Sequence, residues 1–76
     1  MPRITPLPSR KLCRVFELAG FTLSRKEGGH FVYTKLGVPM PTVIPEGDEV
    51  PVFVIRNNLR SAGMSRGEYF KLLQRA

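Results

Sequence analysis

The sequence predicts an α+β fold, in which helices cover one face of a three-stranded antiparallel sheet in the order helix, three strands, helix, short helix. Apolar residues recur every three or four positions near both ends of the chain, the middle alternates apolar and polar residues, and glycines or prolines separate the segments. Because an amphipathic helix needs an apolar partner, the helices are expected to pack on the sheet. At 76 residues the chain has room for one domain, residues 1–76.

The first helix is predicted over residues 9–19. The apolar residues of one side fall at helical spacing: Leu12, Val15, Phe16 and Ala19. Ser9 is the expected N-cap, because a serine oxygen can accept hydrogen bonds from the free amides of a first turn. Gly20 is expected to end the helix in the left-handed conformation.

The middle of the chain is predicted to form three strands. Residues 21–25 alternate apolar and polar side chains, which predicts a half-buried strand, and residues 26–29 form the expected turn. Residues 30–35 are rich in β-branched and aromatic side chains and form the returning strand, with His30 at its first position. Residues 40–45 contain two prolines, which lack amide donors and so restrict a third strand to an edge.

Two helices are predicted after an acidic loop. In residues 52–62 apolar residues recur at positions 52, 55, 59 and 62, and Gly63 follows as the expected C-terminal stop. Ser65 and Glu68 have the spacing of a capping box, and Met64 and Tyr69 that of a hydrophobic staple. A short third helix is therefore expected to continue through Leu73.

The charge of the chain points to a polyanionic partner. The chain has twelve lysines and arginines and six acidic residues, which gives a net charge of +6. Three of the acidic residues lie close together in sequence: Glu46, Asp48 and Glu49. A field of this sign attracts nucleic acid, anionic lipid or an acidic protein, although it also serves simple solubility. No apolar run approaches the length of a membrane span, the N-terminus lacks the apolar core of a secretion signal, and Cys13 has no partner for a disulfide. A cytoplasmic location is expected, with no membrane partner.

Motifs along most of the chain resemble the HicA family of bacterial toxins. The shared residues are Gly20-Phe21, Arg25, Gly28-Gly29-His30, Tyr33, Ile44-Pro45, Ile55-Arg56, Leu59-Arg60, Ala62-Gly63 and Ser65 through Leu73. The resemblance implies a fold similar to double-stranded RNA-binding domains, an endoribonuclease activity that cleaves mRNA, and a HicB-like antitoxin that covers the active surface. It also places the histidine on which the family's activity depends at His30.

Two departures from the family pattern bear on activity. Gly28 keeps a family glycine, but Gly29 replaces the serine common between that glycine and the histidine. Many relatives also carry a second histidine shortly after the proline that closes the third strand, whereas Pro45 is followed here by Glu46-Gly47-Asp48. If that histidine assists catalysis, the protein is slow or inactive; if it only shapes the loop, activity is kept.

The hairpin residues suit RNA cleavage. RNA carries its own nucleophile in the 2′-hydroxyl, and a histidine exchanges protons near neutral pH, so His30 is the candidate general acid or base. Arg25 and Lys26 are the nearest cations in sequence and could hold the phosphate. Gly28 and Gly29 would let the RNA backbone approach their amides, or they only make the turn. Without catalysis, His30 would be an ordinary surface residue of the hairpin.

Arginines of the second predicted helix are further candidates for RNA contact. Arg56 and Arg60 are four residues apart, an unfavourable spacing that bound phosphates or an acidic antitoxin would relieve, although the side chains can also splay into water. Tyr33 and Cys13 are expected to be packing residues. No metal-ligand spacing and no nucleotide-binding glycine loop is present, so neither a metal nor a small-molecule cofactor is expected. The alternative function is a non-catalytic module that binds RNA or the antitoxin.

Overall fold

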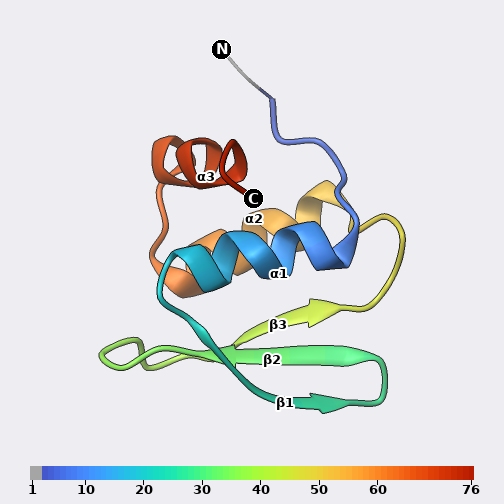
Figure 1. Cartoon of the computed structure of the whole chain (residues 1–76), viewed down its shortest axis with the longest axis vertical. Helices are drawn as coiled ribbons and strands as arrows, with labels where there is room; N and C mark the ends of the chain where they lie inside the picture. Colours follow the sequence, from blue (N-terminus) through green and yellow to red (C-terminus); the bar gives the residue numbers. More distant parts are fainter. Residues whose placement is uncertain (1–2) are drawn as a thin grey trace.

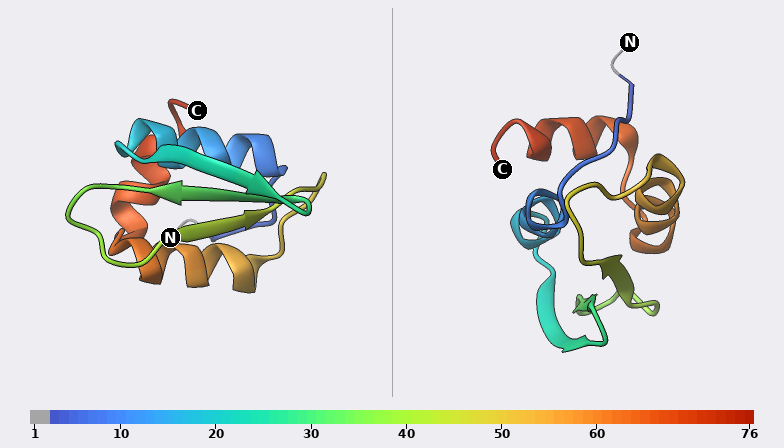
Figure 2. Two further views of the ribbon diagram at one scale, coloured as in Figure 1. Left: turned by 90° about the horizontal axis from the view of Figure 1, so that it is seen from below. Right: turned by 90° about the vertical axis from the view of Figure 1, so that its right-hand side faces the viewer.

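The computed structural model describes residues 3–76 and confirms the predicted class and element order. The elements are α1 (Ser9–Leu18), β1 (Thr22–Glu27), β2 (His30–Thr34), β3 (Thr42–Pro45), α2 (Val52–Ala62) and α3 (Arg66–Leu73). The strands form one antiparallel sheet in the order β1-β2-β3. Helices α1 and α2 lie side by side over one face of this sheet, and α3 packs on the far side of them (Figures 1 and 2).

The sheet has one face toward the helices and one face away from them. In the register of β2 with β3, Phe31 lies opposite Ile44 and Tyr33 lies opposite Thr42. Three of these four residues are buried, and Phe31 packs against the core. The alternate residues are His30, Val32, Val43 and Pro45, and we call the side of the sheet that carries them the open face. The helices thus leave one face of the sheet accessible to a partner.

The β1–β2 hairpin is tighter than the sequence indicates. The predicted strand 21–25 and turn 26–29 are wrong in their bounds, because β1 continues to Glu27, which pairs with His30. Only Gly28 and Gly29 form the turn, with φ of 52° and 82°. A two-residue hairpin turn with positive φ at both positions has the right-handed twist of the strands it joins, and glycine adopts it without strain.

Strand β1 is exposed along its whole length, so the predicted half-buried pattern is also wrong. The register with β2 shifts between Leu23 and Arg25, and such a bulge interrupts the period-two alternation. Phe21 lies just before the strand, is buried, and packs edge-on against Phe16 with ring centroids 5.3 Å apart. The residue of this segment that packs in the core, Phe21, therefore lies before the start of β1.

Helix α1 begins differently from the prediction. Pro8 is the N-cap and makes no side-chain capping bond, whereas Ser9 is the first helical residue and is buried. The proline ring fixes φ near the observed −60°, and the Pro8 carbonyl accepts from the amides of Lys11 and Leu12. The Ser9 hydroxyl instead accepts from the Gly47 amide at 3.1 Å, and the Ser9 amide donates to the Gly47 carbonyl at 2.9 Å. Ser9 therefore ties α1 to the loop after β3.

The remaining helix ends agree with the sequence. Gly63 follows α2 with a left-handed φ of 68°, and the Ser65 hydroxyl accepts from the Glu68 amide at 3.1 Å at the start of α3. The buried core lies mainly between the sheet and the helices: Ile4, Leu12, Cys13, Val15, Phe16, Phe21, Tyr33, Ile44, Val50, Ile55, Leu59, Met64, Tyr69 and Leu72. No helix in residues 3–76 is both long and apolar enough to pass through a lipid bilayer.

Candidate RNA-cleavage site

His30 lies at the first position of β2, exposed on the open face of the sheet. Its cross-strand neighbours are Glu27 on β1 and Pro45 on β3, so it occupies the central strand at the hairpin end of the sheet. Side chains directly opposite each other on one face of a sheet have Cβ atoms about 4.5 to 5.5 Å apart. The histidine ring is accordingly reachable from solvent, and within residues 3–76 no hydrogen bond or ion pair joins it to Glu27.

Arg25 lies on the same face as His30 but is already paired. It occupies the position opposite Val32, two residues before Glu27, and its Nε donates a hydrogen bond to Glu27 Oε2. Both side chains are more than half exposed. Such a pair contributes little to stability, and a phosphate group can compete for the guanidinium.

Lys26 points to the opposite side of the hairpin from Arg25. It lies across from Phe31, with its Nζ 5.1 Å from the centre of that ring and 3.1 Å from Glu46 Oε2. The two cations that the sequence placed together are therefore separated by the sheet. Because each of these cations pairs with a carboxylate, Glu27 or Glu46, the charges of the four side chains sum to zero.

The glycines of the turn are open to solvent on the side where a Cβ would project. A Cβ built on Gly28 or Gly29 meets no heavy atom within 4 Å. The Gly29 carbonyl accepts from the Glu46 amide at 2.7 Å, which joins the turn to the loop after β3. The positive φ values account for glycine at both positions, and the free space beside them leaves room for a sugar-phosphate chain.

Arg56 and Arg60 lie on the exposed side of α2, away from the hairpin in sequence and in the other layer of the fold. Neither forms an ion pair with any residue in the described range 3–76. Phe53 and Asn57 share this side of the helix, and Phe53 is 67% exposed. The structure thus does not group these arginines with His30 in one site. Exposure of Phe53 was not predicted, although a helical projection of residues 52–62 places this phenylalanine on the polar side.

Tyr33 and Cys13 are packing residues, as predicted. Tyr33 is buried, and its hydroxyl donates to Glu17 Oε2 at 2.7 Å; burial and this bond raise the pKa of the phenol far above its usual range. Burial also raises the pKa of the Cys13 thiol. Since the thiolate is the nucleophilic form, a buried, protonated Cys13 is unsuited to attack a substrate.

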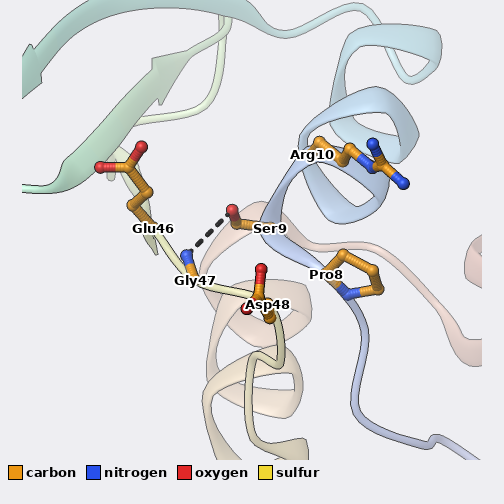
Figure 3. Close-up of a pocket in the computed structure, with 6 residues that line it drawn as sticks. All are labelled: Pro8, Ser9, Arg10, Glu46, Gly47 and Asp48. Atoms are coloured by element: carbon orange, nitrogen blue, oxygen red, sulfur yellow. Dashed lines mark hydrogen bonds between the residues drawn. The ribbon is translucent and has the colours of Figure 1, made fainter.

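A pocket of about 420 Å³ lies at the start of α1, and its lining is Pro8, Ser9, Arg10, Glu46, Gly47 and Asp48 (Figure 3). His30 is not among the lining residues, so the pocket and the histidine are separate features. Within residues 3–76 no three His, Cys, Asp or Glu side chains gather in a group that could hold a metal ion. The chemistry-bearing side chains nearest to one another along the open face are Arg25, Glu27 and His30.

The fold and the hairpin define a class: a small basic α+β protein that presents a histidine on the uncovered face of its sheet. A family model described as the HicA toxin of bacterial toxin-antitoxin matches residues 9–64. The chain belongs to the HicA toxin family, and its function is that of the toxin in a toxin-antitoxin module, which implies an antitoxin partner. A search of curated proteins gave no match.

Proposed function

We propose that this toxin is an endoribonuclease that cleaves mRNA with His30 as its general acid or base. The observation that carries the proposal is the position of His30: exposed, on the open face, and next to a glycine turn with free space around it. A histidine held at such a place can reach a phosphodiester without any rearrangement of the core. Membership in a toxin family supports the same conclusion.

The proposed reaction uses the substrate's own hydroxyl. The 2′-hydroxyl loses its proton to a base, its oxygen attacks the adjacent phosphorus, and the bond from phosphorus to the 5′-oxygen breaks. The products are a 2′,3′-cyclic phosphate and a 5′-hydroxyl, which takes up a proton from an acid. One imidazole can serve as the base in its neutral form or as the acid in its charged form, and no bound metal is required by this scheme.

We assign the RNA contacts to two places. At the hairpin, Arg25 contacts phosphate after exchanging its Glu27 partner, Lys26 does the same after leaving Glu46, and Gly28 and Gly29 allow close approach of the backbone. On α2, Arg56 and Arg60 provide a second set of cations that no carboxylate within residues 3–76 neutralises. These assignments are supported by exposure and charge.

The partner and setting follow from the same proposal. A HicB-like antitoxin inhibits the toxin by covering the hairpin, and the toxin acts in the cytoplasm, where mRNA is available. The whole chain, residues 1–76, acts as one HicA-like domain with a fold related to double-stranded RNA-binding domains. The helix-covered antiparallel sheet of the structure supports this relationship.

The decisive experiment compares the wild type with His30→Ala on a labelled single-stranded RNA in the presence of a chelator. Loss of a general acid or base costs about 100-fold or more in rate, so His30→Ala should be inactive within assay limits. Val43→Ala is the matched control, because Val43 is 42% exposed on the same open face and carries no titratable group. An active His30→Ala protein, or a wild type that cleaves only with added metal, contradicts the proposal.

A second candidate function is a non-catalytic module that binds RNA or the antitoxin. It is favoured by the hairpin charges, since Arg25 and Lys26 each already face a carboxylate, and by the lack of a second histidine in the chain. This function predicts salt-sensitive RNA or antitoxin binding with no cleavage by the wild type. The same assay therefore separates the two candidates.

A further inference from the structure

We propose that Phe53 on α2 is a stacking platform for one unpaired base, and that Arg56 and Arg60 hold the adjacent phosphates. This side of the helix would then select single-stranded over double-stranded RNA. The inference deepens the proposed function and rests on it for the identity of the ligand as RNA. It concerns binding alone, so it can be tested with an oligonucleotide that the protein cannot cleave.

The side chains of the proposed platform lie along one side of α2. Positions 53, 56, 57 and 60 are three or four residues apart from one turn to the next, which places them on the same side of a helix. All four are exposed, whereas Ile55 and Leu59 are buried on the other side. We call the exposed set the α2 stripe, and it consists of Phe53, Arg56, Asn57 and Arg60.

The α2 stripe has no side-chain partner inside the described part of the chain. Phe53 is 67% exposed, and within residues 3–76 its ring contacts neither another ring nor a cation. Over the same residues neither Arg56 nor Arg60 forms an ion pair. A single exposed apolar side chain is ordinary on a protein surface. Here the aromatic ring accompanies two uncompensated guanidinium groups, and this combination is typical of surfaces that bind single-stranded nucleic acid.

The distribution of charge around α2 assigns separate roles to the ring and the arginines. The three acidic residues of the loop 46–49 precede the helix, and both of its arginines follow Phe53. Phosphates are therefore attracted to the C-terminal side of Phe53, and the ring is left to an uncharged group. Arg56 and Arg60 are about 6 Å apart along the helix axis, a separation that suits neighbouring phosphates of one strand. An acidic peptide also pairs with arginines, but RNA supplies flat bases for the ring as well.

The position of α2 lets one strand reach both the platform and the histidine. Pro45, at the end of β3, pairs with His30, and the chain then passes through one loop to the start of α2. Seen from the open face, α2 runs along the β3 edge of the sheet and begins at the end where the hairpin turn lies (Figure 2). A strand that crosses the open face near His30 can thus continue past this edge onto the α2 stripe.

Stacking on Phe53 requires a base that is not paired. In a duplex the faces of the bases are covered by their neighbours, whereas unpaired bases can be splayed out and stacked on aromatic side chains. Contacts with phosphates alone do not make this distinction. The platform therefore predicts that loss of the ring weakens binding of single strands and leaves binding of duplexes nearly unchanged.

The first test measures binding of a labelled 2′-O-methyl RNA of about 12 nucleotides by fluorescence anisotropy. The methyl group removes the nucleophile of the proposed reaction, so the wild-type protein can be used. We expect Phe53→Ala to weaken binding of the single strand about 5- to 150-fold, the usual effect of removing a stacking aromatic side chain. Binding of the same strand annealed to its complement should change less than about twofold. Leu36→Ala is the matched control and should bind as wild type, because Leu36 is fully exposed beyond the other end of β2.

Two further variants separate stacking from an ordinary apolar contact and from charge. Phe53→Leu keeps apolar surface without an aromatic face and should lose binding as Phe53→Ala does, whereas Phe53→Tyr should keep most of it. Arg56→Gln should flatten the slope of log K against log salt concentration by about 0.7, and Phe53→Ala should leave that slope unchanged. Equal losses for single strand and duplex overturn the inference. Binding by Phe53→Leu equal to wild type also overturns it and would assign the ring to an apolar partner such as a protein.

A tryptophan reports the stacked base directly. The chain contains no tryptophan, so Phe53→Trp introduces a single indole at the platform, and stacking with a base quenches indole emission. We expect the single strand to quench Phe53→Trp over the concentration range in which it binds, and to leave the emission of Leu36→Trp unchanged. Bound single strand without quenching, or equal quenching by the duplex, overturns the inference.

Failure of the proposed function gives a different result from failure of the platform. Absence of cleavage of unmodified RNA by wild type, or cleavage by His30→Ala, contradicts the proposed function whatever the Phe53 variants do. A wild type that cleaves RNA, together with a Phe53→Ala protein that binds the single strand equally well, overturns the platform alone.

Discussion

Glu46 pairs with Lys26, a cation that we propose to contact RNA, so removal of the Glu46 charge should strengthen RNA binding. Lys26 Nζ lies 3.1 Å from Glu46 Oε2, and both side chains are about half exposed. In Glu46→Gln the ammonium group loses its charged partner and becomes free to contact one phosphate. Each phosphate neutralised on a single strand contributes about −0.7 to the slope of log K against log salt concentration. The slope should therefore steepen by about 0.7, which corresponds to roughly fivefold tighter binding at 0.1 M salt relative to 1 M.

The assay is fluorescence anisotropy with an end-labelled single-stranded RNA, in a His30→Ala background, which we expect to leave the RNA intact. Binding is measured from about 50 to 200 mM KCl, where one added phosphate contact changes the salt response by a factor of about 2.6. Glu68→Gln is the matched control, because it changes the net charge equally but lies on α3, beyond the helix layer. Equal slopes in the two variants would show that only net charge matters. An unchanged slope in Glu46→Gln would refute the assignment of Lys26 to phosphate.

Three further expectations concern stability and the hairpin. Burial raises the pKa of Tyr69 to about 12, whereas an unfolded tyrosine ionises near ~10. The stability that results from this difference is fully present below about pH 10. The free energy of unfolding should therefore fall by about 2 to 3 kcal/mol as the pH rises to 12. Tyr69→Phe should flatten this alkaline loss in urea unfolding at pH 8 and 11, and an equal loss in both proteins would contradict it. Gly29→Ala should cost about 1 to 2 kcal/mol, because its φ is 82°. Gly67 lies in α3, and a Cβ built there meets no heavy atom within 4 Å, so Gly67→Ala should instead stabilise the protein by about 0.5 to 1 kcal/mol. Thermal unfolding in which both alanine variants changed the stability in the same direction would contradict this explanation. Ser65→Ala should cost about 1 kcal/mol by removing the bond to the Glu68 amide, and a change within error in urea would contradict that capping role.

Local patterns were sufficient for the helices and for the order of the elements. The spacing of Ile55, Leu59 and Ala62 locates α2, and the Ser65–Glu68 pair locates the start of α3, because both signals depend on residues within one or two helical turns. The position of His30 at the start of β2 was also predicted, since two glycines precede it. These features need no knowledge of the tertiary structure.

The features that the sequence did not predict depend on contacts between distant segments. Ser9 has the chemistry of an N-cap, but Gly47, far along the chain, binds its hydroxyl. Arg25 and Lys26 are adjacent in sequence, yet strand alternation sends them to opposite sides of the hairpin, where Lys26 meets Glu46. Local composition does not predict the bulge in β1 or the pairing of Lys26 with Glu46. The arrangement of charges at the candidate site could therefore be described only from the structure.

The loop that follows β3 is fastened at two consecutive residues. The Glu46 amide donates to the Gly29 carbonyl in the hairpin turn, and Gly47 exchanges two hydrogen bonds with Ser9 at the start of α1. These hydrogen bonds connect the loop after β3 to the hairpin turn on one side and to α1 on the other. We therefore expect a molecule that binds this loop to affect the turn as well. Deuterium uptake at the Glu46 amide accordingly measures how often its bond to Gly29 opens. Slower uptake on addition of an antitoxin would show that the antitoxin restricts the motion of the hairpin turn.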